Sequence, residues 1–307
     1  MGFRLKSGQS VSNEIRRIVL QQLDRATSEL TSIGDPESDE AIHDARRRVK
    51  KIRAIIRLVR PVLDKEHRAD PALRQVSKLL APVADGQGVI DTLNQMSKRY
   101  RRELPPKMAE AIRSDLVDRG RRIDTQASKE GVLEKAQMTL RAERQRVKKW
   151  KISADGFRAV APGLKASVRR ARGAMVDAWL HPTASHHHTW RRHVKNHWFH
   201  VRLLEGRCGN RLMPLQRRLE ALDGVLGEYH NLVLLREVLI VDTALSRREA
   251  ARCLRVVARY QRALRRHAQT LGMRIYGEKP RQFVRRVKRL WRSAKAADGA
   301  VREGDAL

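Results

Sequence analysis

The sequence predicts an all-α protein made of two helical bundles in tandem, and three observations lead to it. Most segments of the 307-residue chain carry apolar residues at the helical period, and the alternating runs typical of strands are scarce. Pro and Gly fall between these segments, where helices end. The order of the segments then repeats after about 145–150 residues, which indicates an internal duplication.

The first half divides into five expected helices. Ser10 or Ser12 is a suitable N-cap for the first, Gly34 ends it, and a turn over 35–39 follows. The second is rich in Lys and Arg, and the third is expected to break at 84–88, with Asp85 as a cap. Their ranges are 11–33, 40–63, 72–83 continued by 89–100, 105–128, and 131–151.

The second half repeats this order from about residue 154. Pro182 and Thr183 separate an opening helix from a second basic one, and the next helix is expected to break at His230–Asn231, with Asn231 as a cap. The expected ranges are 159–180, 184–205, 212–229 continued by 232–242, 245–271, and 281–296. We therefore divide the chain into repeats 1–151 and 152–307.

The second expected helix holds eight Lys or Arg between Arg46 and Arg60, and from Ile42 onward Asp44 is its only acid before Asp64. At 100° per residue its apolar residues span about 120° to 240° from His43. A neighbouring basic arc, from about 260° through 0° to 40°, leaves out Arg48 and Lys51. It contains His43, Arg46, Arg47, Lys50, Arg53, Arg57 and Arg60. Such a run is more often a solvated face. However, a solvated face usually mixes signs so that i,i+4 pairs form, and acids are almost absent here.

The same stripe occurs a second time, 145 residues later and without a gap. His188 matches His43, and Lys195 matches Lys50. The remaining basic matches are Arg191, Arg192 and Arg202. Trp198 replaces Arg53; it either stacks a nucleic-acid base or, as we favour, packs between the bundles.

Composition restricts the partner. The net charge of +32 favours a polyanion, whereas 41% hydrophobic residues argue against disorder throughout. No apolar run approaches the length of a membrane span, and the start, MGFRLKSGQS, fits neither a signal peptide nor a myristoylation pattern. Cys208 and Cys253 form no disulfide framework and no CxxC pair, which fits a reducing, cytoplasmic setting.

Three stretches together resemble the conserved-histidine α-helical domain, CHAD: DPESDEAIHDARRRVKKIRAIIRLVRPVL, HTWRRHVKNHWFHVRLL and LDGVLGEYHNLVLLREVL. The resemblance covers about residues 10–295. It implies two four-helix-type bundles related by a pseudo-two-fold axis and a basic central channel that binds inorganic polyphosphate without catalysis. By position, the channel residues would be His43, Arg46, Arg47, Lys50, Arg53, Arg57, His188, Arg191, Arg192, Lys195, Arg202 and His230. Association with polyphosphate granules is a further expectation. The chain departs from the family pattern at Ala84-Asp85 and at His230-Asn231.

Other chemistries were weighed against this one. A general polyanion or RNA/DNA-binding protein is the alternative, because this net charge attracts nucleic acid in any case.

Seven of the eleven His lie in 181–200, including His186–His188, but no acid or Cys stands at ligand spacing, so no metal site is expected. His197 falls on the core side and is expected to be buried. No Walker loop, carboxylate pair or nucleophile motif is present, so neither an enzyme nor a cofactor is expected.

Overall fold

The computed structural model describes residues 2–31, 38–67, 70–241 and 243–304, and this part of the chain is all-α. Its only other regular features are two short 3-10 helices and an isolated bridge between Leu63 and Ile152. The all-α prediction is confirmed. In the same residues, no helix is both long and apolar enough to cross a membrane.

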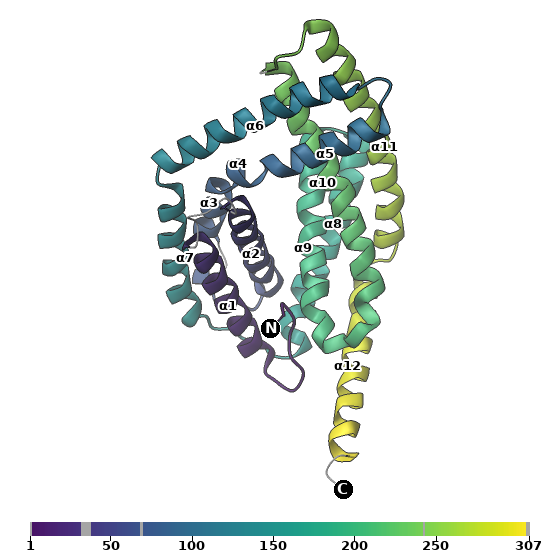
Figure 1. Ribbon diagram of the computed structural model, residues 1–307. Coiled ribbons are helices and arrows are strands. Elements are labelled where there is room, and N and C mark those ends of the chain that lie inside the picture. The colour runs from purple at the N-terminus through teal and green to yellow at the C-terminus, as the bar shows by residue number, and fades with distance from the viewer. Residues whose placement is uncertain (1, 32–37, 68–69, 242, 305–307) are drawn as a thin grey trace.

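The helices of the first half begin and end close to the expected positions, as Figure 1 shows. They are α1 (Val11–Thr31), α2 (Ser38–Val59), η1 (Lys65–His67), α3 (Pro71–Leu79), α4 (Ala81–Ala84), α5 (Gly86–Arg99), α6 (Pro106–Lys129) and α7 (Val132–Lys148). Residues 38–39, expected in a turn, already belong to α2; the end expected at Gly34 lies outside the described residues. α2 ends before residue 63 because Pro61 lacks an N–H and disfavours helical backbone at Arg60.

The helices of the second half are α8 (Phe157–Leu180), α9 (Ala184–Cys208), η2 (Gly209–Leu212), α10 (Met213–Val241), α11 (Arg247–Tyr276) and α12 (Pro280–Gly304). The expected break at His230–Asn231 is wrong, because α10 is continuous there. A single internal Gly such as Gly227 costs a helix only about 1 kcal/mol. Asn231 does not cap a helix; its Nδ2 donates to the Gly88 carbonyl (2.8 Å) and to Thr92 Oγ1 (3.0 Å).

The first break is real but is not capped as expected. The chain departs from regular helix at Leu80, just before Pro82, and again at Asp85, which gives the three pieces α3, α4 and α5. Asp85 stands at the N-cap of α5 and makes no capping hydrogen bond with its side chain. Its carboxylate instead contacts Arg46 of α2.

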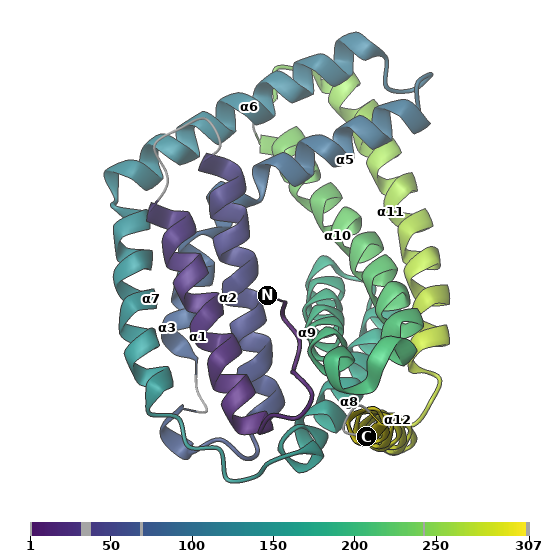
Figure 2. The ribbon, with the colours of Figure 1, turned by 60° about the horizontal axis from the view of Figure 1, so that its bottom comes forward.

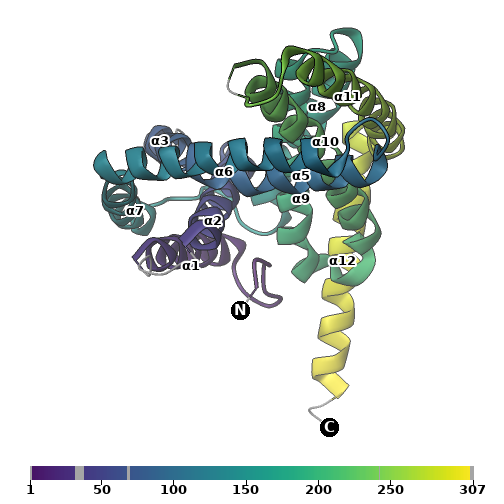
Figure 3. The same ribbon diagram turned by 45° about the horizontal axis from the view of Figure 1, so that its top comes forward.

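Two hydrophobic cores hold the helices together. The larger joins α1, α2, α3 and α7 to α8, α9, the start of α10 and α12. The smaller lies between α5 and α6 on one side and α10 and α11 on the other. Figures 2 and 3 show α5 and α6 crossing from the first half to lie over α10 and α11. Both cores therefore cross the boundary at 151/152, and the division into two repeats stays a prediction.

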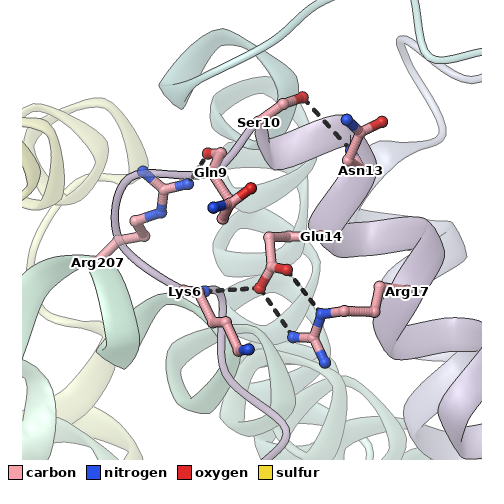
Figure 4. Close-up of polar contacts among 7 residues, drawn as sticks. All are labelled: Lys6, Gln9, Ser10, Asn13, Glu14, Arg17 and Arg207. Carbon is pink, nitrogen blue, oxygen red and sulfur yellow. Dashed lines mark hydrogen bonds and ion pairs between the residues drawn. The ribbon is translucent and has the colours of Figure 1, made fainter.

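The two basic helices, α2 and α9, lie side by side and are fixed by backbone contacts. His200 of α9 donates its Nε2–H to the Ala54 carbonyl of α2 at 2.8 Å. The N-terminal segment runs between α1 and α9 (Figure 4): Leu5 N donates to the Leu203 carbonyl at 2.9 Å, and Lys6 N donates to Glu14 at 2.8 Å. Arg207 donates to the Gln9 carbonyl from the other side.

Candidate anion-binding site

The packing of α2 against α9 brings the two predicted cation stripes together. At the centre is a group that we call the cation cluster, made of His43, Arg46, Lys50, His188, Arg191, Lys195 and His230. His230 comes from α10, which passes beside α9. The structure thus groups seven of the twelve predicted site residues in one place.

Lys50 is the most unusual member of the cluster. Burial lowers the pKa of its ammonium to about 6, and the positive charges of Arg46, Lys195 and Arg191 act in the same direction against a smaller opposing effect of Asp85. No carboxylate lies within ion-pair distance of Lys50 in the described part of the chain. In the absence of an anion, Lys50 is therefore mostly neutral at pH 7.

Two carboxylates, Asp85 and Asp223, partly neutralise the positive charge of the cation cluster. Lys195 Nζ lies 3.1 Å from Asp223 Oδ2, and burial lowers the Lys195 pKa although Asp223 opposes the shift. Arg46 Nη2 donates to Asp85 Oδ2 at 3.2 Å. Burial raises the pKa of Asp85, but the hydrogen bond and charge of Arg46 outweigh it, so that the Asp85 pKa is lowered. Even with both carboxylates counted, the net charge of the cation cluster remains positive.

The histidines of the cluster are neutral at pH 7. The rings of His188 and His230 lie 5.0 Å apart between centroids. Burial, followed by the charge of Arg191, lowers the pKa of His230 to about 4 and also lowers that of His188. Burial and Lys50 lower the pKa of His43. A neutral imidazole still offers one N–H, so these residues provide donors to an anion without adding charge.

A second basic group extends the cluster along α2. Asp70 Oδ2 lies 2.5 Å from Arg53 Nε and 3.6 Å from Arg57 Nη2. Burial lowers the Arg57 pKa to about 10, Asp70 opposes this, and Arg192 and Arg170 add positive charge nearby. Arg57 remains protonated at neutral pH. Arg170 comes from α8 and was not predicted, because α8 carries no copy of the stripe.

His193 belongs to the same neighbourhood and was also missed by sequence reasoning. Burial lowers its pKa to about 4, with contributions from Arg192, Arg170 and Arg57. The clustering of His between 181 and 200 was the available signal, but His193 falls outside the repeat-matched positions.

A third group, on the other side of the cluster, contains Arg47 and Arg202. Arg47 Nη2 donates to Asp44 at 2.9 Å, and the Arg202 guanidinium lies 5.1 Å from the Trp198 ring centroid. Lys51, placed outside the predicted arc, joins this group: burial and then the charges of Arg47 and Arg202 lower its pKa to about 8. A long side chain reaches beyond the helical angle of its Cα, which is why the projection missed it.

Three other residues singled out in the sequence, Arg48, Trp198 and His197, lie outside the cation cluster. Arg48 lies outside the site, with its Nε 2.6 Å from Glu29 of α1. Trp198 is half-buried and stacks on Phe199 at 5.3 Å between ring centroids, as expected for packing. His197 is buried, with Nδ1 3.4 Å from the Tyr276 hydroxyl. Within the described residues no group of three or more His, Cys, Asp or Glu is placed to hold a metal ion.

Comparison with known proteins gives two findings. The sequence model of the CHAD domain matches residues 17–240. Among solved structures, PptA from Streptomyces chartreusis is similar with a TM-score of 0.64 at 15% identity, over 88% of this chain and 100% of that one. At this identity the similarity shows a shared fold. No curated protein matches the chain.

Proposed function

The chain belongs to the CHAD family, and on that premise we propose that it binds inorganic polyphosphate through the cation cluster and its two basic extensions, without catalysing a reaction. The observation that carries the proposal is Lys50, a half-buried lysine surrounded by cations and lacking an ion-pair partner in the described residues. Such a group destabilises the free protein, and an anion at this position would remove the cost.

Polyphosphate suits the arrangement better than a compact anion does. The three basic groups follow the length of α2 and α9, from Arg47 and Arg202 through Lys50 to Arg57 and Arg192. A linear chain with charge on every phosphate can contact all of them. Arg provides forked donors to phosphate oxygens, and Lys provides a compact charge. In this proposal the basic groups line a central channel between two pseudo-symmetric bundles, repeats 1–151 and 152–307.

RNA or DNA binding is the alternative function. The net charge of +32 attracts any polyanion, and release of counterions drives such binding. However, Trp198, the aromatic residue within the stripe, is stacked on Phe199 and covered by Arg202. The site therefore offers little to a base, and polyphosphate remains the favoured ligand. Cytoplasmic recruitment to polyphosphate granules follows if the ligand is long-chain polymer.

The test compares two charge-matched double variants by calorimetric titration with long-chain polyphosphate. Lys50→Gln with Arg191→Gln removes two groups of the cluster that are both cationic when an anion is bound, whereas Arg247→Gln with Arg248→Gln removes two exposed cations at the start of α11. Charge-assisted contacts contribute about 1.5–3 kcal/mol each, so the cluster variant should lose at least about a hundredfold in affinity. The control variant should lose only a few-fold.

Equal losses in the two variants would show that total charge, and not a site, binds the polymer. A competition with single-stranded RNA at about 0.15 M salt distinguishes the ligands. We expect polyphosphate to displace RNA by a wide margin; parity would support the general polyanion function. Phosphate release from polyphosphate, lost on a point substitution, would contradict the non-catalytic role.

A further inference from the structure

A second concave site lies away from the cation cluster, where three helix faces meet. It is lined by α8, by the start of α9 and by the middle of α11, and we call it the α11 pocket. α8 contributes residues at positions i, i+3 and i+4 of one face, the segment between α8 and α9 contributes Pro182, and α11 contributes residues at i, i+3, i+4 and i+7. Its lining residues are Met175, Ala178, Trp179, Pro182, His187, Trp190, Arg262, Arg265, Arg266 and Gln269.

The floor of the α11 pocket is apolar and rigid. Met175, Ala178 and Trp190 are buried there. α11 approaches this floor closely one turn further on, at Gly272, where an added Cβ would lie 2.7 Å from both Met175 and Trp190. His187 forms part of the wall; its ring stacks on Tyr229 at 4.5 Å, and its Nδ1 donates to the Thr183 carbonyl at 2.8 Å.

The rim of the pocket combines one aromatic ring with positive charge. Trp179 is 55% exposed, which is unusual for so large an apolar side chain. Arg262 and Arg266 are exposed and Arg265 is half-buried. Within the described part of the chain no carboxylate pairs with these three guanidinium groups. Burial lowers the pKa of the neighbouring His187, and the charge of Arg265 acts in the same direction.

This combination selects a ligand with an aromatic ring and an anionic group. The cavity measures about 230 Å³, less than the roughly 300–1,000 Å³ of pockets that enclose a whole drug-sized ligand. It therefore suits one ring system, with the remainder of the ligand on the rim. An indole face stacks heteroaromatic rings, and Arg binds phosphate oxygens through paired donors.

We propose that the α11 pocket is a nucleotide site, in which the base lies against Trp179 and the apolar floor and the phosphates contact Arg262, Arg265 and Arg266. Inorganic polyphosphate has no ring to place on this floor, so the pocket and the cation cluster differ in ligand class. The proposal does not depend on polyphosphate binding at the cluster. It gives the protein a means of sensing or recruiting a nucleotide at a separate surface.

The test is calorimetric titration of the full chain with ADP, with inorganic pyrophosphate as a ligand lacking the base and adenosine as one lacking phosphate. The Lys50→Gln with Arg191→Gln variant serves as background in all titrations, so that the cation cluster contributes little. We expect ADP to bind at least about fivefold more tightly than either partial ligand. Trp179→Ala should abolish this advantage, and Trp179→Phe should restore most of it.

The arginines are tested with a matched pair on one helix. Arg266→Gln should weaken ADP binding about threefold to tenfold, whereas Arg274→Gln, an exposed arginine of α11 outside the pocket, should leave it unchanged. Equal affinities for ADP and pyrophosphate, or full ADP affinity in Trp179→Ala, would overturn the proposal. Arg255 is an exposed arginine of α11 that lies seven residues before Arg262 and outside the pocket. If a single-stranded oligonucleotide binds more than about a hundredfold more tightly than ADP, and Arg255→Gln removes this advantage, the ligand is a nucleic-acid strand and the nucleotide proposal is wrong.

Discussion

Lys50 shows how a single residue can couple anion binding to proton uptake. Its position at the centre of the α2 stripe faces Lys195 and Arg191 of α9, and burial there lowers its pKa to about 6. In an unfolded chain the same group has a pKa near 10.5. Between these values the unfolded chain holds more protons, so the stability of the free protein should rise with pH across that window.

We predict that polyphosphate binding at pH 8 is accompanied by uptake of about one proton at Lys50. The bound anion favours the charged ammonium, so the Lys50 pKa rises towards its ordinary value and the neutral amine takes up a proton. Burial also lowers the pKa of Lys195, although the charge of Asp223 opposes this shift. Burial lowers the pKa values of His43, His188 and His230, so the contribution of these rings to the uptake grows as the pH falls.

Calorimetry in two buffers with different ionisation enthalpies measures the uptake directly. Affinity should fall as pH rises from 6 to 10, by up to about tenfold per unit for each proton. Lys50→Gln should lower both the uptake and the slope, and Arg247→Gln, an exposed control, should change neither. A buffer-independent binding enthalpy would contradict the prediction.

The sequence was sufficient to predict that Lys50 and Lys195 take equivalent positions in the two stripes. It did not predict which carboxylates would contact the cation cluster. The stripe angles and the 145-residue shift put both lysines in equivalent, inward positions, and the structure brings them together. Asp223 was not predicted because it lies on α10, where only the tertiary path of that helix brings it within 3.1 Å of Lys195. Arg170 and His193 were missed for the same reason: no repeat or helical period connects them to Arg57.

At the scale of elements, the close packing of α8 against α2 requires a glycine at position 163. Gly163 lies where α8 crosses α2, and a Cβ there would lie 1.7 Å from the Leu58 carbonyl oxygen. The obstacle is backbone, so no side chain can move aside. The approach of α8 to α2 also determines where Arg170 stands relative to Arg57.

We predict that Gly163→Ala destabilises the protein by at least about 3 kcal/mol, because overpacking against backbone forces the two helices apart. Gly173→Ala provides the control in the same helix: it has nothing within 4 Å, so the change should be neutral or stabilising by up to about 1 kcal/mol. Chemical denaturation of both variants measures the difference. Similar midpoints for the two would show that α8 and α2 are not held at this spacing.

Helix positions were largely predictable, and one of the two predicted helix breaks was wrong. Periodicity gave α1, α6 and α8 with ends within a few residues, because each has a complete apolar face. The predicted break in α10 was an extrapolation from the Pro-containing break before α5. α10 has no Pro in that region, and Leu232 and Leu235 pack into the smaller core and keep the helix intact.

At the scale of the molecule, helices of the first half pack against helices of the second half. α5 and α6 leave the first half and share a core with α10 and α11, while α2 packs on α8 and α9. The internal repeat in the sequence could not predict this crossing. A duplicated order of helices is compatible with two separate bundles, and equally with helices of one half that pack into the other half. The buried surfaces that face the other half are apolar on both sides.

We predict that residues 1–151 and 152–307 do not fold independently. Alone, the first fragment would expose the core residues Leu93, Met96 and Ile112, and the second would expose Leu235 and Val257, with which they share the smaller core. Each Å² of apolar surface that a fragment leaves exposed to water removes roughly 25 cal/mol of hydrophobic stabilisation. Because native stability is only about 5–15 kcal/mol, these losses exceed what either half can sustain.

Calorimetry of the intact chain should show one cooperative transition, with equal calorimetric and van't Hoff enthalpies. The separate fragments should lack near-ultraviolet circular dichroism and regain it on mixing, because the shared cores form only when both are present. Two resolved transitions, or a first fragment with native-like dichroism alone, would instead establish the halves as independent folding units. In that case the crossing of α5 and α6 would be a docking contact, and the cation cluster, which needs both α2 and α9, would assemble after folding.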